Sequence, residues 1–167
     1  MSLNNIHLSP FLVEQLYKKT LVDVNLLKPL ILPDKTKSIS FLGKNEKEIL
    51  LVVNETETLF LSDVDLNLLV SILSACKLTL ADVALINFDK NKTASYNILM
   101  EQFAPKCILL FGVNPTELSF PLHFPKYQLQ QYNNQTYVCS TSLKVLGEDI
   151  LQKKELWLCL QKYFFNP

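Results

Sequence analysis

The sequence contains no arginine. Its sixteen basic residues are all lysines, and they balance sixteen acidic residues to a net charge of zero. Arginine is the residue that best reads guanine and phosphate through paired hydrogen bonds, and a neutral chain lacks the broad positive surface of a nucleic-acid binder. We therefore expect no direct, sequence-specific recognition of nucleic acid, and at most a local patch of lysines.

Glycine and histidine are also scarce, with three and two residues among 167. Phosphate-binding loops of the Walker and Rossmann types need glycines at the first turn after a strand, and this chain has no such cluster. A Ser-His-Asp triad would have to use His7, in the N-terminal tail, or His123, in a proline-rich loop, and the G-x-S-x-G serine motif is absent. We predict that both histidines are structural or solvent-exposed.

The four cysteines stand far apart, and no two of them have the C-x-x-C spacing of a metal or cluster site. They are Cys76, Cys107, Cys139 and Cys159. All four fall in apolar stretches, so we predict buried, reduced thiols. No metal site and no cofactor is predicted.

Membrane-directing segments are missing as well. No run approaches the roughly 18 apolar residues that a membrane span needs. The first residues, MSLNN, lack the basic segment followed by an apolar one that marks a signal peptide. We therefore expect a cytoplasmic protein without a membrane partner.

What the chain does have is short apolar runs closed by turn residues. The clearest is the run at 107–111, which lies between Pro105 and the breakers Gly112, Asn114 and Pro115. Such runs predict strands that are buried on both faces, as in parallel sheets covered by helices. Further runs of this kind lie at 48–53, 83–88 and 136–140.

Helical spacing of apolar residues predicts helices at about 63–77 and 96–103, and a third after about 148. Ser62 and Asp65 match a capping box before the first of these, whose apolar stripe is widened by Leu68 and Ile72. One side of the last helix is expected to carry Ile150, Leu151, Trp157, Leu158, Leu160 and Phe164. Trp157 is predicted to be mostly buried, beside Leu160.

The remaining segments complete the predicted fold. Residues 38–42 and 48–53 predict a β-hairpin, and 114–134 predict irregular structure. The order of the elements predicts a three-layer α/β/α sandwich with a mainly parallel sheet of four to five strands.

Residues 1–24 are predicted to be an N-terminal helix or partner-binding peptide, followed by a single domain over 25–167. The candidate partner-binding side chains are Phe11, Leu16, Tyr17 and Leu21. Pro29 and Pro33 then indicate a connector. The alternative is that this helix packs on its own domain.

Ligands of open parallel sheets bind at the carboxyl ends of the strands. The candidate site is therefore built from the segments 54–57, 87–89, 112–114 and 140–142. Glu55 and Asp89 could form a catalytic carboxylate pair there; the alternative is two loop acids that face water.

These segments, in their order along residues 38–165, resemble the uracil-DNA glycosylase superfamily. There, a strand ends in the catalytic loop, later strands end in Asn and in Gly, and a His-bearing loop precedes a helix with Lys and Trp. The matching pieces here are residues 50–54, 66–87, 108–112, 137–142 and 153–157. The loop at 54–57 lacks the glycine and proline of the catalytic loop, and the loop at 140–142 lacks the histidine. The resemblance thus implies this fold with a degenerate pocket at Asn54, Glu55, Asn87, Gly112 and Ser140.

The chain is also similar to one non-catalytic branch of that fold, the psi-subunit family of the bacterial DNA polymerase III clamp-loader complex. The likeness rests on the stretches EQLY at 14–17, LLKP at 26–29 and KELW at 154–157, and on the aromatic end at 163–165. It implies an adaptor whose N-terminal peptide docks on clamp-loader subunits and whose domain binds a chi-like subunit, which contacts single-stranded-DNA-binding protein. The rival hypotheses are a diverged glycosylase or nucleotide hydrolase that uses Glu55 and Asp89, and a binding module outside replication.

Overall fold

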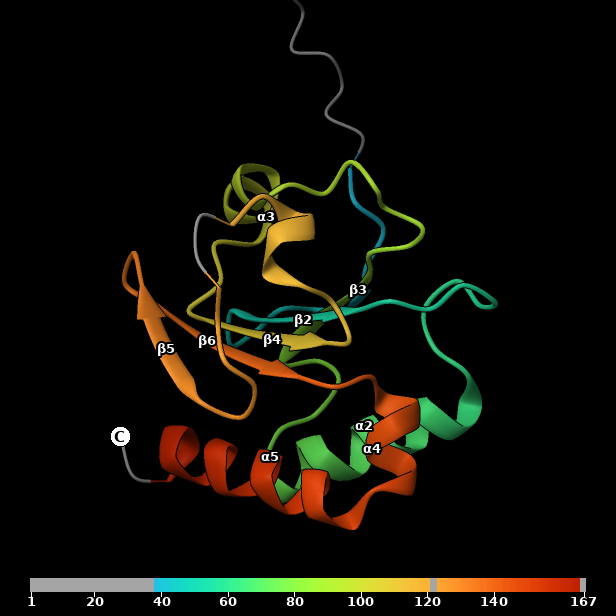
Figure 1. Ribbon diagram of the computed structural model, residues 1–167. Coiled ribbons are helices and arrows are strands. Elements are labelled where there is room, and N and C mark those ends of the chain that lie inside the picture. Colours follow the sequence, from blue (N-terminus) through green and yellow to red (C-terminus); the bar gives the residue numbers. More distant parts are fainter. Residues whose placement is uncertain (1–37, 121–122, 166–167) are drawn as a thin grey trace, which may run out of the picture. The chain divides into compact units, whose positions relative to one another are not determined.

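The computed structural model describes residues 38–120 and 123–165 (Figure 1). The chain divides into two compact units, residues 1–37 and 38–167, and every element described below belongs to the second. The predicted partner-binding peptide 1–24, with Phe11, Leu16, Tyr17 and Leu21, lies outside the described residues, and so does His7.

The second unit is an α/β fold built on a six-stranded mixed sheet with the strand order β1-β3-β2-β4-β6-β5. The strands are β1 (Leu42–Gly43), β2 (Ile49–Val53), β3 (Val83–Asn87), β4 (Cys107–Phe111), β5 (Leu129–Tyr132) and β6 (Gln135–Ser140). The central strands β3, β2, β4 and β6 run parallel, and the edge strands β1 and β5 pair antiparallel with their neighbours.

Helices cover both faces of this sheet, an arrangement compatible with a three-layer sandwich (Figure 1). Four α-helices are described, α2 (Asp63–Ala75), α3 (Tyr96–Phe103), α4 (Leu143–Glu148) and α5 (Ile150–Phe164), together with a 3₁₀ turn, η2 (Pro115–Leu118). Helices α2, α4 and α5 pack on one face, and α3 packs on the other with η2.

Alternate residues of each central strand point to opposite cores. In β2, Leu51 packs toward α2 and α5, whereas Leu50 and Val52 pack toward α3. Every residue of β2, β3 and β4 is buried. This double burial explains why these strands are unbroken apolar runs in the sequence, and those strand predictions are confirmed.

The predicted count and direction of the strands were wrong, because both edge strands were misread. The hairpin between 38–42 and 48–53 does not form: β1 pairs with β3, so β3 lies between the two predicted arms. The amides of Asn45 and Lys47 donate to the carbonyls of Val83 and Asp82, which ties the turn to β3 and not to its own strand. Gly43 permits this close approach with its φ of +107°.

The segment 114–134, predicted to be irregular, holds η2 and β5. Strand β5 forms a hairpin with β6 around Asn133 and Asn134, whose φ angles are 51° and 60°. Two consecutive residues at positive φ form the turn that matches the twist of a two-residue hairpin, and asparagine tolerates this conformation well.

The start of the last helix is confirmed, and its predicted buried side is confirmed only in part. Asp149 caps α5 by accepting hydrogen bonds from the amides of Leu151 and Gln152. The residues of α5 that are buried are Leu156, Cys159 and Leu160. Ile150 and Leu151 are 78% and 73% exposed, and Trp157 is half-buried. Leu160 is buried as predicted, and Trp157 and Phe164 pack against the core, whereas Leu158 is exposed like Ile150 and Leu151. The predicted stripe therefore combined apolar residues from two faces of the helix.

Two further predictions are confirmed. Ser62 caps α2, with its Oγ accepting a hydrogen bond from the Asp65 amide at 3.2 Å. All four cysteines are free and buried. Among the described residues, no helix has the length and hydropathy needed to cross a membrane.

Candidate functional site

The carboxyl ends of the four parallel strands meet at one edge of the sheet, as predicted. Val53 is in register with Asn87 on one side and with Phe111 on the other, and Phe111 is in register with Ser140. The structure therefore brings the predicted segments 54–57, 87–89, 112–114 and 140–142 to the same edge.

Asn87, at the end of β3, is fully buried and its side chain is committed to the neighbouring loop. Its Oδ1 accepts hydrogen bonds from the amides of Glu55 and Asp89, at 3.0 and 3.1 Å. Its Nδ2 donates to the carbonyls of Glu55, Thr58 and Leu59, at 2.7, 3.2 and 3.2 Å. Since an amide side chain has two donor hydrogens and one acceptor oxygen, Asn87 has no spare group for a ligand and instead shapes the loop 54–61.

The ends of β4 and β6 are also closed by local structure. Gly112 has a φ of +69°, and a Cβ placed on it would lie 2.9 Å from the Cβ of Ser142. Ser140 is buried, and its Oγ has no hydrogen-bond partner among the described residues. Gly112 and Ser140 thus lie in a tight junction between β4, β6 and the start of α4, where Ser142 is the N-cap.

Thr141, in the last predicted loop, belongs to a polar network that anchors α5. The Tyr127 hydroxyl donates to Gln152 Oε1 at 2.7 Å and lies 2.8 Å from Thr141 Oγ1. Gln152 Nε2 in turn donates to Asp149, and this bond, with those from the backbone amides, holds the pKa of Asp149 below its ordinary value. These polar groups stabilise the helix start and are not available for chemistry.

Asp89, the proposed catalytic partner of Glu55, is paired with lysines. Its carboxylate lies 2.8 Å from Lys92 Nζ and 3.2 Å from Lys90 Nζ, and these contacts hold the pKa of Asp89 below its ordinary value. Lys90 also donates to the Thr56 carbonyl at 2.6 Å, which ties the two loops together. A lowered pKa suits a structural ion pair and disfavours a general base, whose pKa should lie near neutral pH.

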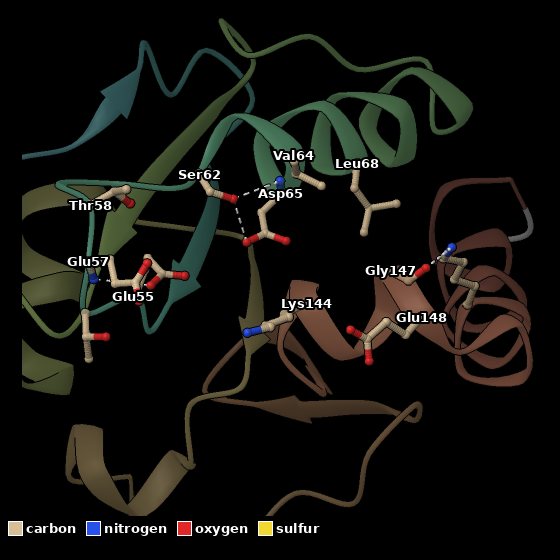
Figure 2. A pocket seen from close by; sticks show the side chains of 12 residues that line it. Glu55, Glu57, Thr58, Ser62, Val64, Asp65, Leu68, Lys144, Gly147 and Glu148 are labelled. Atoms are coloured by element: carbon tan, nitrogen blue, oxygen red, sulfur yellow. Dashed lines mark hydrogen bonds between the residues drawn. The ribbon is translucent and has the colours of Figure 1, made fainter.

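An open pocket of about 670 Å³ lies beside this edge, between the loop 54–58, the start of α2, and α4 (Figure 2). We call it the acidic pocket, because Glu55, Glu57, Asp65 and Glu148 line it together with Lys144 and Lys153. Of the five predicted pocket residues, Glu55 is the one that lines it; Asn54 is exposed, and the other three lie in the closed edge described above.

A second, apolar groove of about 200 Å³ runs between α2 and α5. Its lining is Leu68, Ser71, Ile72, Ala75, Lys153, Leu156, Trp157 and Leu160, and we call it the α2–α5 groove. Leu68 and Lys153 line both this groove and the acidic pocket, so the two hollows adjoin. This surface was not predicted from the sequence, although Leu68 and Ile72 were expected to widen the apolar stripe of α2.

The buried cysteine thiols are disfavoured as nucleophiles, and no metal-binding cluster is found among the described side chains. Burial raises the pKa of the Cys107 thiol to about 12 and those of Cys76 and Cys139 to about 11, so the reactive thiolate form is disfavoured at neutral pH. His123 is exposed. Within residues 38–120 and 123–165, no group of three or more Asp, Glu, His or Cys side chains is arranged to hold a metal ion.

Comparison with known proteins gives no family assignment: neither a family model nor a curated protein matches the chain.

Proposed function

We propose that this chain is a non-catalytic adaptor of the DNA replication machinery, comparable to the psi subunit, which links the clamp loader to chi and to single-stranded-DNA-binding protein. The observation that carries the proposal is the α2–α5 groove, where the half-buried Trp157 and the partly exposed Leu68 and Ile72 leave apolar surface uncovered. Hollow apolar surfaces with an aromatic anchor are typical of protein-binding sites.

The proposal includes the finer fold type, a degenerate uracil-DNA glycosylase-like sandwich. It is supported by the strands β2, β3, β4 and β6, whose ends carry the segments on which the resemblance rests. The hydrogen bonds of Asn87 support the non-catalytic part, because this side chain holds its own loop where a base-binding asparagine would need free donors and acceptors.

The enzymatic rival is tested by base excision. We expect no release of uracil from single- or double-stranded DNA, because stabilisation of a leaving anion is usually the largest catalytic contribution and Ser140, Thr141 and Ser142 offer no histidine for it. The measurement is strand cleavage at the abasic product, against a buffer control. Excision that Glu55→Ala abolishes would contradict the adaptor proposal.

The adaptor proposal itself is tested by capture of clamp-loader subunits on the full-length chain. A chain that begins at Leu26 is expected to keep a melting temperature close to that of the full chain and to lose those subunits, because residues 38–167 form a compact unit of their own. The full-length double variant Phe11→Ala, Leu16→Ala tests the same contact without shortening the chain, and it should also lose the clamp-loader subunits. If the shortened chain melts many degrees lower, the first residues are part of the core, and the hypothesis that they form a docking peptide loses its support.

A further inference from the structure

We infer that the α2–α5 groove and the adjoining acidic pocket together bind an amphipathic helix of a partner protein, with its apolar face in the groove and its lysine or arginine side chains over the acidic pocket. This inference rests on the proposed adaptor function and adds the chemistry of the partner segment. It commits to a basic, amphipathic helix.

The groove has the apolar lining of a helix-binding site. It lies between two helices and is walled by Leu68, Ile72, Leu156, Trp157 and Leu160. Its volume of about 200 Å³ is below the roughly 300–1,000 Å³ that small-molecule sites usually offer. A few apolar side chains from one face of a helix, spaced at i, i+3, i+4 and i+7, suit such a groove.

Apolar surface continues from the groove toward the end of α5. The ring of Phe165 packs edge-on against Trp157, with 6.2 Å between centroids, and is 41% exposed. Lys77 Nζ lies 5.5 Å above the Phe165 ring. The apolar surface therefore extends beyond the groove to Phe165.

The charge at the other end of the groove decides what kind of helix fits. The acidic pocket presents four carboxylates and two lysines, and Lys153 Nζ already donates to the Gly147 carbonyl at 2.9 Å. Among the described residues none of these four carboxylates forms an ion pair (Figure 2). Such an excess of negative charge attracts a cationic segment and repels nucleic-acid phosphates and anionic lipids.

Trp157 is the one tryptophan of the sequence, so its fluorescence reports on the groove directly. The probes are synthetic 18-residue helical peptides without tryptophan, which carry leucines at i, i+3, i+4 and i+7. One peptide has three lysines at its N-terminus, and a second has three lysines at its C-terminus. Each has a partner peptide with glutamates in place of these lysines. We expect a saturable blue shift with a lysine peptide that weakens with added salt, and binding about tenfold weaker for its glutamate partner.

Two pairs of variants locate the binding. Ser71→Arg fills the groove from an exposed position of α2 and should abolish the shift. Ser74→Arg, at another exposed position of α2 that lies outside the groove, should not. Glu148→Lys should weaken the lysine peptide and favour the glutamate peptide. Its control, Glu155→Lys, is an exposed change on α5 outside both hollows and should leave the two affinities unchanged.

Several outcomes would overturn the inference. One is equal affinity for lysine and glutamate peptides, and another is peptide binding that survives Ser71→Arg. Acrylamide quenching of the Trp157 fluorescence in the full-length chain could give two further outcomes that overturn the inference. If Trp157 is shielded at every protein concentration, another part of the chain covers the groove, and if shielding grows with concentration, a second copy does.

The replication role is separated from the groove by repeating the capture experiment with Ser71→Arg. If the clamp-loader subunits and any chi-like subunit are retained unchanged, the adaptor proposal stands and the helix inference fails. If the lysine peptide binds and no such subunit is captured, the groove is a protein-binding site and the replication role fails.

Discussion

Replacing Asn87 by alanine is expected to lower the free energy of unfolding by roughly 3 kcal/mol or more. Five hydrogen bonds end on this fully buried side chain, and its loss would leave two amides and three carbonyls of the loops 55–59 and 87–89 without their partner. A hydrogen bond contributes about 0.5–1.5 kcal/mol net, and a buried polar group left unpaired costs about 1–3 kcal/mol. Urea denaturation followed by circular dichroism measures the change.

The variant Asn87→Asp adds a signature in pH. A carboxylate at this place would face the three carbonyls that now accept from Nδ2, and burial would raise its pKa above the value of about 3.9 in an unfolded chain. A group whose pKa is raised on folding stabilises the protein below its unfolded pKa and loses that contribution as the pH rises through its folded pKa. The deficit of the variant relative to the wild type should therefore widen from pH 4 to pH 7.

Asn54 provides the matched control, because it is exposed at the end of the neighbouring strand β2. Asn54→Ala should change stability by no more than about 0.5 kcal/mol. If Asn87→Ala were as stable as the wild type, the side chain would be free to act in a binding site, and the non-catalytic proposal would lose its main structural support.

The parts of the fold that the sequence predicted well share one physical cause. The strands β2, β3 and β4 are buried on both faces, so nearly every position must be apolar and the pattern is unmistakable. The cap at Ser62 is equally readable, because one local side chain satisfies a helix amide. These signals depend on the residue itself or on neighbours a few positions away.

The misread parts depend on partners far along the chain. Strand β1 has two residues, and its pairing with β3 follows from how closely Gly43 approaches Val83 and not from any pattern of its own. The β5–β6 hairpin had a local signal in Asn133 and Asn134, but a two-asparagine turn is weaker than the usual Asn-Gly.

The sequence correctly predicted that the carboxyl ends of the parallel strands meet at one edge of the sheet, but the chemistry of that edge could not be predicted from the sequence. The sequence around Asn87 would be the same whether its side chain bound a ligand or its own loop. In the structure the side chain is hydrogen-bonded to the loop. The sequence showed that Leu68 and Ile72 widen the apolar stripe of α2, but not which surface they line. In the structure, Leu69 and Leu73 lie in the core beneath, while Leu68 and Ile72 line the α2–α5 groove.

Replacing Gly112 by alanine is expected to destabilise the protein by about 2–4 kcal/mol, through two effects that add. The φ of +69° is a left-handed conformation that alanine adopts with strain, and the new Cβ would lie 2.9 Å from the Cβ and 3.1 Å from the Cα of Ser142. Backbone cannot yield as a flexible side chain can, so the junction between β4 and α4 must shift.

Gly147, in α4, gives the opposite expectation. A Cβ there would meet its nearest neighbour, Leu68 Cδ2, at 3.9 Å, which is ordinary contact, and alanine is the better helix former by up to about 1 kcal/mol. Gly147→Ala should therefore melt at or above the wild-type temperature while Gly112→Ala melts well below it. Lys144 and Glu148 belong to α4 and line the acidic pocket, so a shift of α4 would displace them. The Gly112 variant should therefore also bind the lysine peptide more weakly at temperatures where it remains folded. Equal melting temperatures for the two alanine variants would mean that the β4–α4 junction is less tightly packed than the distances around Gly112 indicate. They would also mean that α4 does not hold the acidic pocket in place.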